Sequence, residues 1–600
     1  MICSSSMIST PDLPRRFWLI AAACVSLAAC SEAEPDVPPL EGALAALEEG
    51  DGFGAEVLLR DMLSSGTPKP QVAAYLGEAE LLQGQPVEAR RWLGEGQFSD
   101  ETAGRGFHML GRLEMREGNL PAAGTAFDRS IAFTPDAPRL WVDIGRLRYR
   151  GGEQSQAVDA AERAVELGPD DPEALLFRGQ LARDSEGMAA ALPWFEQALQ
   201  HKPDQLDLLA EYAATLGELG EAQDMLSVVR HMANLNPGYL RGYYLQAVVA
   251  ARAGQFDLAR KLLFRSGEFA NDAPAGIMLA GVIDLETGNY ASAAQAFDKL
   301  FRQQPENRRV RELLARALAL GGNHREMLHR FGEAAKKSSA SPYLRTLVAR
   351  SHEALGDRQS AGALLDVAAK KQSGNLVALR PTGDFESAGT RDARSGDDAL
   401  SLVRNLIVEG NRSEALRVAE GFRERFDGSA DALALAGDAN LAARRVSRAM
   451  SLYRQSARIR QPWPLARRQY AAMKSSGDTN AAIALLQRHL QGHPSAVEPT
   501  VILARAQYDR GNLPRAALLL DQALAFGGDR DPEVLALRAV TAMRMGDDAL
   551  AQRIAQRAMA LQPTNPVSLQ ALAMVSGEAE SQALMAKLGN LGGAVAVANR

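Results

Sequence analysis

Residues 118–127 read GNLPAAGTAF, and residues 511–520 read GNLPRAALLL. In both segments a glycine and two further residues precede a proline that opens an alanine-rich run. This order is typical of a turn that leads into a helix, because the fixed φ of proline suits the first helical turn. Two nearly identical turns in one chain suggest that the turn belongs to a repeated unit.

A glycine recurs along the chain at intervals of 34 residues. The series is Gly50, Gly84, Gly118, Gly152, Gly220, Gly254, Gly288, Gly322 and Gly356. After an interruption it continues as Gly410, Gly477, Gly511 and Gly546, with spacings of 67, 34 and 35 residues. One position of the series holds Glu186, which is followed at once by Gly187. A period of this length predicts a solenoid, in which each unit buries its apolar face against its neighbours.

Each unit is expected to be a helical hairpin. Residues 275–307 contain two runs with apolar residues at helical spacing, one on each side of Gly288, and Pro305 follows the second run. Small residues on both runs allow the helix axes to approach to the lower end of the roughly 8–10 Å range of packed helices. The sequence therefore predicts an all-α protein.

The units resemble the tetratricopeptide repeat. Two of them carry its pattern at Leu110, Gly111, Gly118, Ala123, Phe127 and Pro135, and at Trp141, Gly145, Gly152, Ala157, Ala164 and Pro169. Several other units lack the aromatic residues, and one has an extra residue near Glu186. The resemblance covers about residues 36–565 and implies a right-handed α-solenoid of about fifteen 34-residue hairpins.

The repeat frame divides the chain into segments. We expect a signal peptide of the lipoprotein type at 1–29, a lipidated tether at 30–40, about ten repeats at 41–369, about five at 400–565 and capping helices at 566–600. Residues 370–399 break the rhythm and are rich in Gly, Ser, Asp and Arg. They are either an irregular joint between two arms or a degenerate repeat that still packs.

The amino terminus has the features of a secretory signal. Arg15 and Arg16 precede an apolar run that is shorter than the roughly 20 residues of a spanning helix. The sequence LAAC at 27–30 resembles a bacterial lipobox, which implies that Cys30 is lipidated and begins the mature chain; an uncleaved membrane anchor is the alternative. Because Ser31 rather than aspartate follows, the resemblance implies sorting to the outer membrane, with the protein facing the periplasm.

Composition excludes some classes of protein. Of three cysteines, Cys3 and Cys24 lie in the segment to be removed, so the mature chain keeps no pair for a disulfide. The formal net charge is −6, which argues against nucleic-acid binding through the overall field. His489 and His493 are four residues apart, but Gly492 and the absence of an intervening carboxylate argue against a zinc helix. We expect no metal, no cofactor and no enzymatic activity.

The first helix of each repeat lines a concave groove in the resembled family. Arginines stand at its inward positions at Arg105, Arg112, Arg139, Arg146, Arg241, Arg309, Arg316, Arg350, Arg404 and Arg505. Arginine suits carboxylates and phosphates, so these side chains favour an anionic peptide or polymer. The candidate partner-binding residues are Arg105, Arg112, Arg116, Arg139, Arg146 and Tyr149. Alternatively, the arginines pair with acids of neighbouring repeats, such as Asp143, and only hold the solenoid together.

These features predict a lipid-anchored adaptor that binds other proteins or peptides along its groove. Its architecture resembles that of tetratricopeptide lipoproteins associated with exopolysaccharide export and exosortase (PEP-CTERM) systems. A pilus-assembly or outer-membrane-protein-assembly lipoprotein is an alternative, although those arrays are typically shorter. A third hypothesis is direct binding of an anionic polysaccharide.

Overall fold

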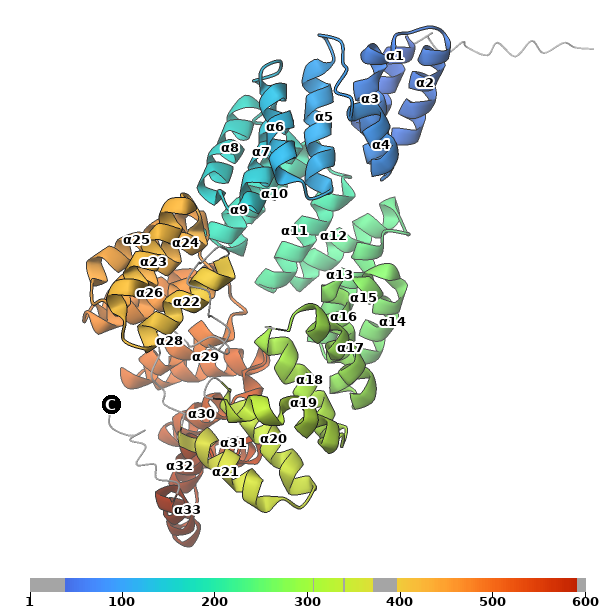
Figure 1. Cartoon of the computed structure of the whole chain (residues 1–600). Helices are drawn as coiled ribbons and strands as arrows, with labels where there is room; N and C mark the ends of the chain where they lie inside the picture. The colour runs from blue at the N-terminus through green and yellow to red at the C-terminus, as the bar shows by residue number, and fades with distance from the viewer. Residues whose placement is uncertain (1–37, 306, 338–339, 371–395, 591–600) are drawn as a thin grey trace, which may run out of the picture. The chain divides into compact units, whose positions relative to one another are not determined.

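The computed structural model describes residues 38–305, 307–337, 340–370 and 396–590. The expected signal peptide, Cys30 and most of the segment at 370–399 lie outside these residues. Within them the chain is helical and has no strand (Figure 1). The prediction of an all-α solenoid is confirmed.

The helices pair as successive hairpins. The first helices are α1 (Pro39–Glu49), α3 (Lys69–Leu82), α5 (Ala103–Arg116), α7 (Pro138–Gly151), α9 (Pro172–Ser185), α11 (Leu206–Leu219), α13 (Leu240–Arg252), α16 (Pro274–Glu286), α18 (Arg308–Leu320), α20 (Pro342–Ala354), α22 (Gly396–Val408), α24 (Ala430–Ala442), α26 (Trp463–Ser475), α28 (Val497–Asp509), α30 (Pro532–Arg544) and α32 (Pro566–Val575). The second helices are α2 (Gly52–Ser64), α4 (Pro86–Leu93), α6 (Leu120–Ile131), α8 (Gln154–Leu167), α10 (Met188–His201), α12 (Ala222–Leu235), α14 (Phe256–Arg265), α17 (Tyr290–Gln303), α19 (His324–Lys336), α21 (Arg358–Lys370), α23 (Arg412–Arg425), α25 (Val446–Ile459), α27 (Thr479–Gly492), α29 (Leu513–Ala525), α31 (Asp548–Leu561) and α33 (Glu578–Asn590).

Two short elements interrupt this alternation. The helix α15 (Glu268–Asp272) lies between α14 and α16, and the 3-10 helix η2 (Gly528–Arg530) lies between α29 and α30. We call α1–α21 the first array and α22–α31 the second array. The first helices of the two arrays begin at Pro39 and Gly396, slightly before the expected starts at 41 and 400. The expected domain limits stay predictions.

The chain divides into two compact units, and the boundary along the sequence falls within α5. One unit ends at Met109 and the other begins at Leu110. The second unit contains most of the first array together with the whole second array, because α8, α9 and α10 contact α25 and α27. The repeat pattern in the sequence does not indicate this division.

The turn glycines take a left-handed backbone conformation. In the described residues, φ lies between +73° and +107° at every glycine of the 34-residue series and at Gly187. At Gly152, for example, the backbone N–H donates to the carbonyls of Arg148 and Tyr149 and so ends α7. Arg444 is the one described residue other than glycine with a positive φ, at 64°. It stands 34 residues after Gly410, so the turn is kept where the glycine is lost.

A ring or a large side chain of the second helix fills the space beside a glycine of the first. A Cβ added to Gly281 would lie 2.6 Å from Cε1 of Phe297, whose side chain is fully buried. The same contact joins Gly111 with Phe127, Gly179 with Phe195, and Gly437 with Tyr453. The absence of a side chain on the first helix thus allows the second helix to pack closely against it.

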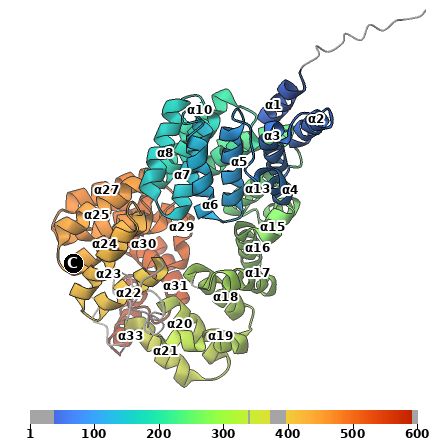
Figure 2. The same cartoon turned by 45° about the horizontal axis from the view of Figure 1, so that its top comes forward.

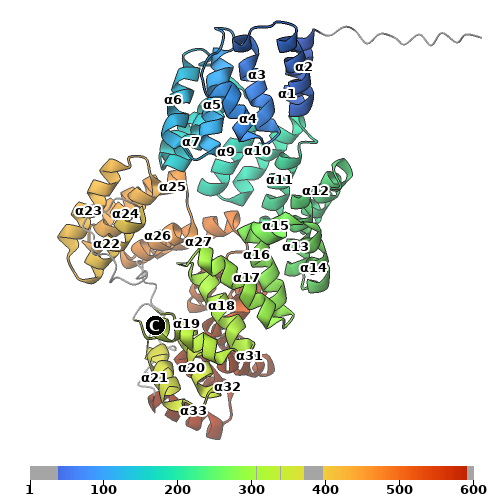
Figure 3. The ribbon, with the colours of Figure 1, turned by 45° about the vertical axis from the view of Figure 1, so that its right-hand side comes forward.

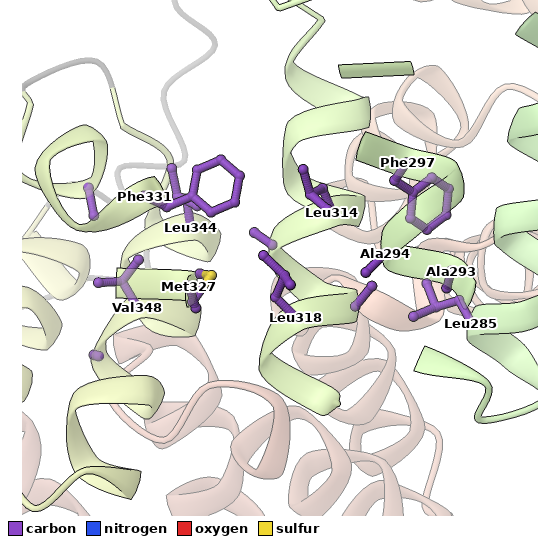
Figure 4. Close-up of a cluster of buried hydrophobic side chains, with 14 of the residues drawn as sticks. Leu285, Ala293, Ala294, Phe297, Leu314, Leu318, Met327, Phe331, Leu344 and Val348 are labelled. Carbon is purple, nitrogen blue, oxygen red and sulfur yellow. The ribbon is translucent and has the colours of Figure 1, made fainter. Parts of the chain in front are cut away.

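The core continues from each hairpin to the next. In Figure 4, side chains from α16 through α20 form one layer of apolar contacts. Its members include Phe297 of α17, Leu314 and Leu318 of α18, Met327 and Phe331 of α19, and Val348 of α20. Because the layer has no break between hairpins, each unit is stabilised by its neighbours, as expected for a solenoid.

The second array also contacts the first array through its backbone. The N–H of Ser155 donates to the carbonyl of Gly428 at 3.1 Å, and the N–H of Gln461 donates to the carbonyl of Asp184 at 2.9 Å. Figures 1 and 3 show α25 beside α9. At the contact of α10 with α27, a Cβ added to Gly187 would lie 2.6 Å from the Cα of Gly492. These contacts fix the register between the two arrays.

We expect Gly281→Ala to lower the free energy of unfolding by about 1–3 kcal/mol, because the added methyl group overpacks the contact with Phe297. Gly332→Ala is the matched control, since Gly332 lies in α19 and an added Cβ would meet nothing within 4 Å. This control should raise the free energy of unfolding by roughly 0.5–1 kcal/mol, because alanine favours a helix more than glycine does. The free energy of unfolding of each variant is measured by urea denaturation. Equal effects of the two substitutions would contradict the close packing of Phe297 against Gly281.

Arg444→Gly should stabilise the second array by about 1 kcal/mol, because it removes the cost of a left-handed conformation at a residue with a side chain. Arg448→Gly, within the neighbouring helix α25, should instead destabilise it by about 1 kcal/mol. Hydrogen exchange of α24 and α25 measures both effects locally. Similar destabilisation by the two substitutions would show that Arg444 is not strained.

Candidate functional site

The predicted groove residues lie on α5 and α7, two first helices. Arg105 Nε lies 2.5 Å from Glu78 Oε2 of α3, and its guanidinium lies 5.1 Å from the ring centre of Tyr75. This arginine is therefore both paired with a carboxylate and stacked on a ring within the hairpin stack, which fixes its orientation.

Asp143 of α7 connects Arg112 and Arg146. Arg112 Nε lies 3.5 Å from Asp143 Oδ2, and Arg146 Nη1 lies 3.2 Å from Asp143 Oδ1. Arg146 Nη2 also lies 3.0 Å from Glu173 Oε2 of α9. Burial opposes the charge of Arg146, but Asp143 and Glu173 outweigh it and raise the pKa of Arg146. The structure thus brings these two arginines together on one nearly buried carboxylate.

Arg139 and Tyr149, at the two ends of α7, also contact the next repeat. Arg139 Nε lies 3.4 Å from Oδ2 of Asp171, the residue that caps α9. The hydroxyl of Tyr149 donates to Asp184 Oδ2 at 2.5 Å. Burial and Asp184 raise the pKa of Tyr149 to about 12, so its hydroxyl keeps its proton at neutral pH. Arg116, the last residue of α5, likewise interacts with other residues of the chain.

The same kind of ion pair recurs along the first array. Arg183 of α9 lies 2.9 Å from Glu211 of α11, and Arg241 of α13 approaches the same carboxylate to 2.7 Å. We call these pairs between successive first helices the ion-pair ladder. Its arginines have carboxylate partners one repeat away, which is the arrangement expected if they join neighbouring repeats.

The ladder is nevertheless accessible. The side chain of Arg112 is 41 % exposed and that of Arg139 is 53 % exposed. Such partly exposed pairs contribute little stability each, typically up to about 1 kcal/mol. The surface therefore presents positive groups next to negative groups, as in the alternative in which the arginines pair with acids of neighbouring repeats. Sequence analysis did not single out Glu173, the partner of Arg146, or Glu211, which Arg183 and Arg241 share, although both glutamates stand on first helices one repeat from an arginine.

His489 and His493 pack together and do not form a metal site with a carboxylate. Their ring centres are 4.6 Å apart, and the ring of Trp463 lies 5.3 Å from that of His489. Burial, followed by His493, lowers the pKa of His489 to about 4, so the ring is neutral at physiological pH. In the described part of the chain, no three His, Cys, Asp or Glu side chains are grouped so as to hold a metal ion. None of the described helices is both long and apolar enough to cross a bilayer.

Several solved structures resemble this chain, with low sequence identity and low TM-scores. A tetratricopeptide repeat protein from Parabacteroides merdae is 16% identical, with a TM-score of 0.29 over 40% of this chain and 94% of that one. The human IFIT1 dimer with m7Gppp-AAAA is 16% identical, with a TM-score of 0.35 over 69% and 94%. The Cut9–Hcn1 hetero-tetramer of APC/C is 12% identical, with a TM-score of 0.26 over 89% and 95%. A comparison with curated proteins gives no significant match.

Family models for the tetratricopeptide repeat match four segments. One model matches residues 142–205, 279–326 and 400–462, and another matches residues 474–540. The matches indicate no catalytic family, and repeats of this kind typically bind other proteins or peptides. Two of the segments lie in the first array and two in the second. Both arrays of the chain therefore contain tetratricopeptide repeats.

Proposed function

We propose that the chain is a non-enzymatic scaffold that binds other proteins of the bacterial cell envelope. The observation that carries this proposal is the presence of tetratricopeptide repeats in both arrays, since such repeats typically bind proteins or peptides. A long series of hairpins offers many similar surfaces along one chain. That property suits an adaptor that holds several partners, or one extended partner, at the same time.

The ion-pair ladder suggests the kind of partner surface that would fit. A ligand on α5 and α7 would meet Arg112 and Arg139 next to the acids with which they pair. A protein segment carries both charges and can match such a pattern, whereas a uniformly anionic polysaccharide would also face the carboxylates. The ladder thus favours a protein partner over direct binding of an anionic polymer.

We further propose that the scaffold is lipid-anchored at Cys30 and faces the periplasm, most simply from the outer membrane. The support is the lipobox-like LAAC at 27–30 with Ser31 after it. Exopolysaccharide export is the pathway we propose, because the array is long and resembles those of the lipoproteins in such systems. Pilus or outer-membrane-protein assembly is the alternative.

Cys30→Ala should abolish incorporation of a fatty-acid probe and release the protein from washed membranes, because the sulfur that carries the lipid is lost. Metabolic labelling followed by membrane fractionation measures both effects. Cys24→Ala, within the expected signal peptide, is the matched control and should leave both unchanged. Labelling that persists in Cys30→Ala would rule out this anchor.

The double substitution Arg112→Gln with Arg146→Gln should reduce capture of envelope proteins by about tenfold, because the ladder loses two adjacent cations. It should also lower the free energy of unfolding by roughly 1–3 kcal/mol, since Asp143 stays nearly buried without them. Capture is therefore quantified by mass spectrometry per folded molecule, with the folded fraction taken from a melting curve.

Arg163→Gln is the matched control for that experiment. Arg163 lies on the second helix α8, its side chain is 45 % exposed, and it pairs with Glu166 at 3.3 Å. Capture by this variant should equal that of the unaltered chain. If the double variant captures as much protein per folded molecule as the control, the ladder only joins neighbouring repeats.

A further inference from the structure

A pocket of about 440 Å³ lies where the end of the first array meets the second array. Arg309 and Arg316 of α18 and Tyr343 of α20 line it from the first array. Arg530 of η2 and Gln562, just after α31, line it from the second. Figure 2 shows α18 near α30 and α31. The volume falls within the roughly 300–1,000 Å³ of ligand pockets in proteins.

Arg530 is already paired with Glu286, but other hydrogen-bond donors of this pocket are less engaged. Arg309 is exposed and forms no ion pair with a described residue, and Arg316 comes no closer than 4.0 Å to its partner Glu286. Tyr343, which is 37% exposed, adds a hydroxyl group to the lining. Gln562 is only 6% exposed, yet its side-chain amide nitrogen has no hydrogen-bond acceptor. A buried donor without an acceptor is costly, at about 1–3 kcal/mol, so this amide nitrogen favours an acceptor atom, from water or from a ligand, in the pocket.

Two of the three acids that line the same pocket, Glu312 and Asp531, are already engaged. Glu312 accepts hydrogen bonds from Arg308 at 2.9 Å and from the Ser341 hydroxyl at 2.6 Å. Asp531 caps α30 by accepting from the backbone N–H of Glu533. Burial, followed by the nearby Asp531, raises the pKa of Glu533 to about 7, which favours the neutral form of this carboxyl compared with an ordinary glutamate. The groups that the pocket can offer a ligand are therefore the donors of Arg309, Arg316 and Gln562.

The walls between these donors are apolar. Leu313 and Pro342 line the pocket from the first array, and Pro532 lines it from the second. An occupant must therefore combine carboxylate and carbonyl oxygens with apolar groups, within a volume that holds only a few residues of chain. A short peptide segment with an acidic side chain has this composition, whereas a polysaccharide presents hydroxyl groups all around its rings.

We infer that this pocket between the two arrays binds a short acidic segment of a partner protein. One carboxylate lies against Arg309 and Arg316, a backbone carbonyl accepts from Gln562, and an apolar neighbour packs on Leu313 and Pro342. The inference rests on the proposed scaffold function and specifies one site for it. Because both arrays supply lining residues, the site exists only while the arrays are in contact.

The test is fluorescence anisotropy of the full chain with a fluorescein-labelled peptide of alternating leucine and glutamate. Arg309→Gln combined with Arg316→Gln should weaken binding by at least about tenfold, through loss of the charge-assisted hydrogen bonds. Arg325→Gln is the matched control, since Arg325 is an exposed arginine of α19 outside the pocket. The control should bind as the unaltered chain does, and the glutamine counterpart of the peptide should bind weakly to all three proteins.

A second variant tests the dependence on both arrays. Gly492→Leu places a side chain where a Cβ would lie 2.9 Å from the carbonyl oxygen of Glu186, so it should separate the arrays without altering a pocket residue. Limited proteolysis confirms the separation, and the variant should lose peptide binding to the same extent. Unchanged binding in a separated chain would overturn the two-array site.

Three results would contradict the inference. They are no binding of the acidic peptide to the unaltered chain, equal binding by the Arg309 and Arg316 variant, and equally effective competition by an alginate oligomer. Capture of envelope proteins by the unaltered chain is measured in parallel. If that capture persists while the peptide fails to bind, this pocket is not the site, and the scaffold function stands.

Discussion

The fold depends on the contact between a bare helix backbone and a ring sixteen residues further along the chain. At Gly281 and Phe297, as at Gly437 and Tyr453, the ring occupies the place where a Cβ would stand. This contact sets the distance between the two helices of a hairpin. That distance in turn determines how the next hairpin stacks, and thereby which side chains of successive first helices can reach one another. The ion-pair ladder, with its partners one repeat apart, follows from this spacing.

The hairpins were predictable because their determinants are local and periodic. A glycine every 34 residues predicts each turn, and the positive φ of these glycines confirms the physical reason. Arg444 shows why the signal is not needed in every unit: neighbouring hairpins hold the turn in place even where the residue disfavours it. The resemblance to tetratricopeptide repeats was carried by the same positions, and it is confirmed by family matches in both arrays.

The candidate site was predictable only in part, because residues that meet in the structure lie far apart in the sequence. The sequence places Arg112 and Arg146 on the same side of successive hairpins, but it cannot decide whether such side chains meet a ligand or an acid. In the structure, Asp143 lies close enough to form ion pairs with both. Arg530 and Gln562 carry no periodic signal that connects them with Arg309. Their meeting depends on how two arrays pack, which no short stretch of sequence encodes.

The close approach of Gly187 and Gly492 has a consequence for how this gene can change. An ordinary solenoid tolerates duplication or deletion of a unit, because each unit touches only its neighbours. Here, the hairpins from α8 to α31 form a closed circuit, in which Gln461 lies opposite Asp184, Gly428 opposite Ser155 and Arg530 opposite Glu286. Adding or removing one hairpin within the circuit would move the members of these pairs apart, so that the contacts between the two arrays could not form. Recombination between near-identical repeats should therefore be tolerated before α8 or after α31, but selected against between them.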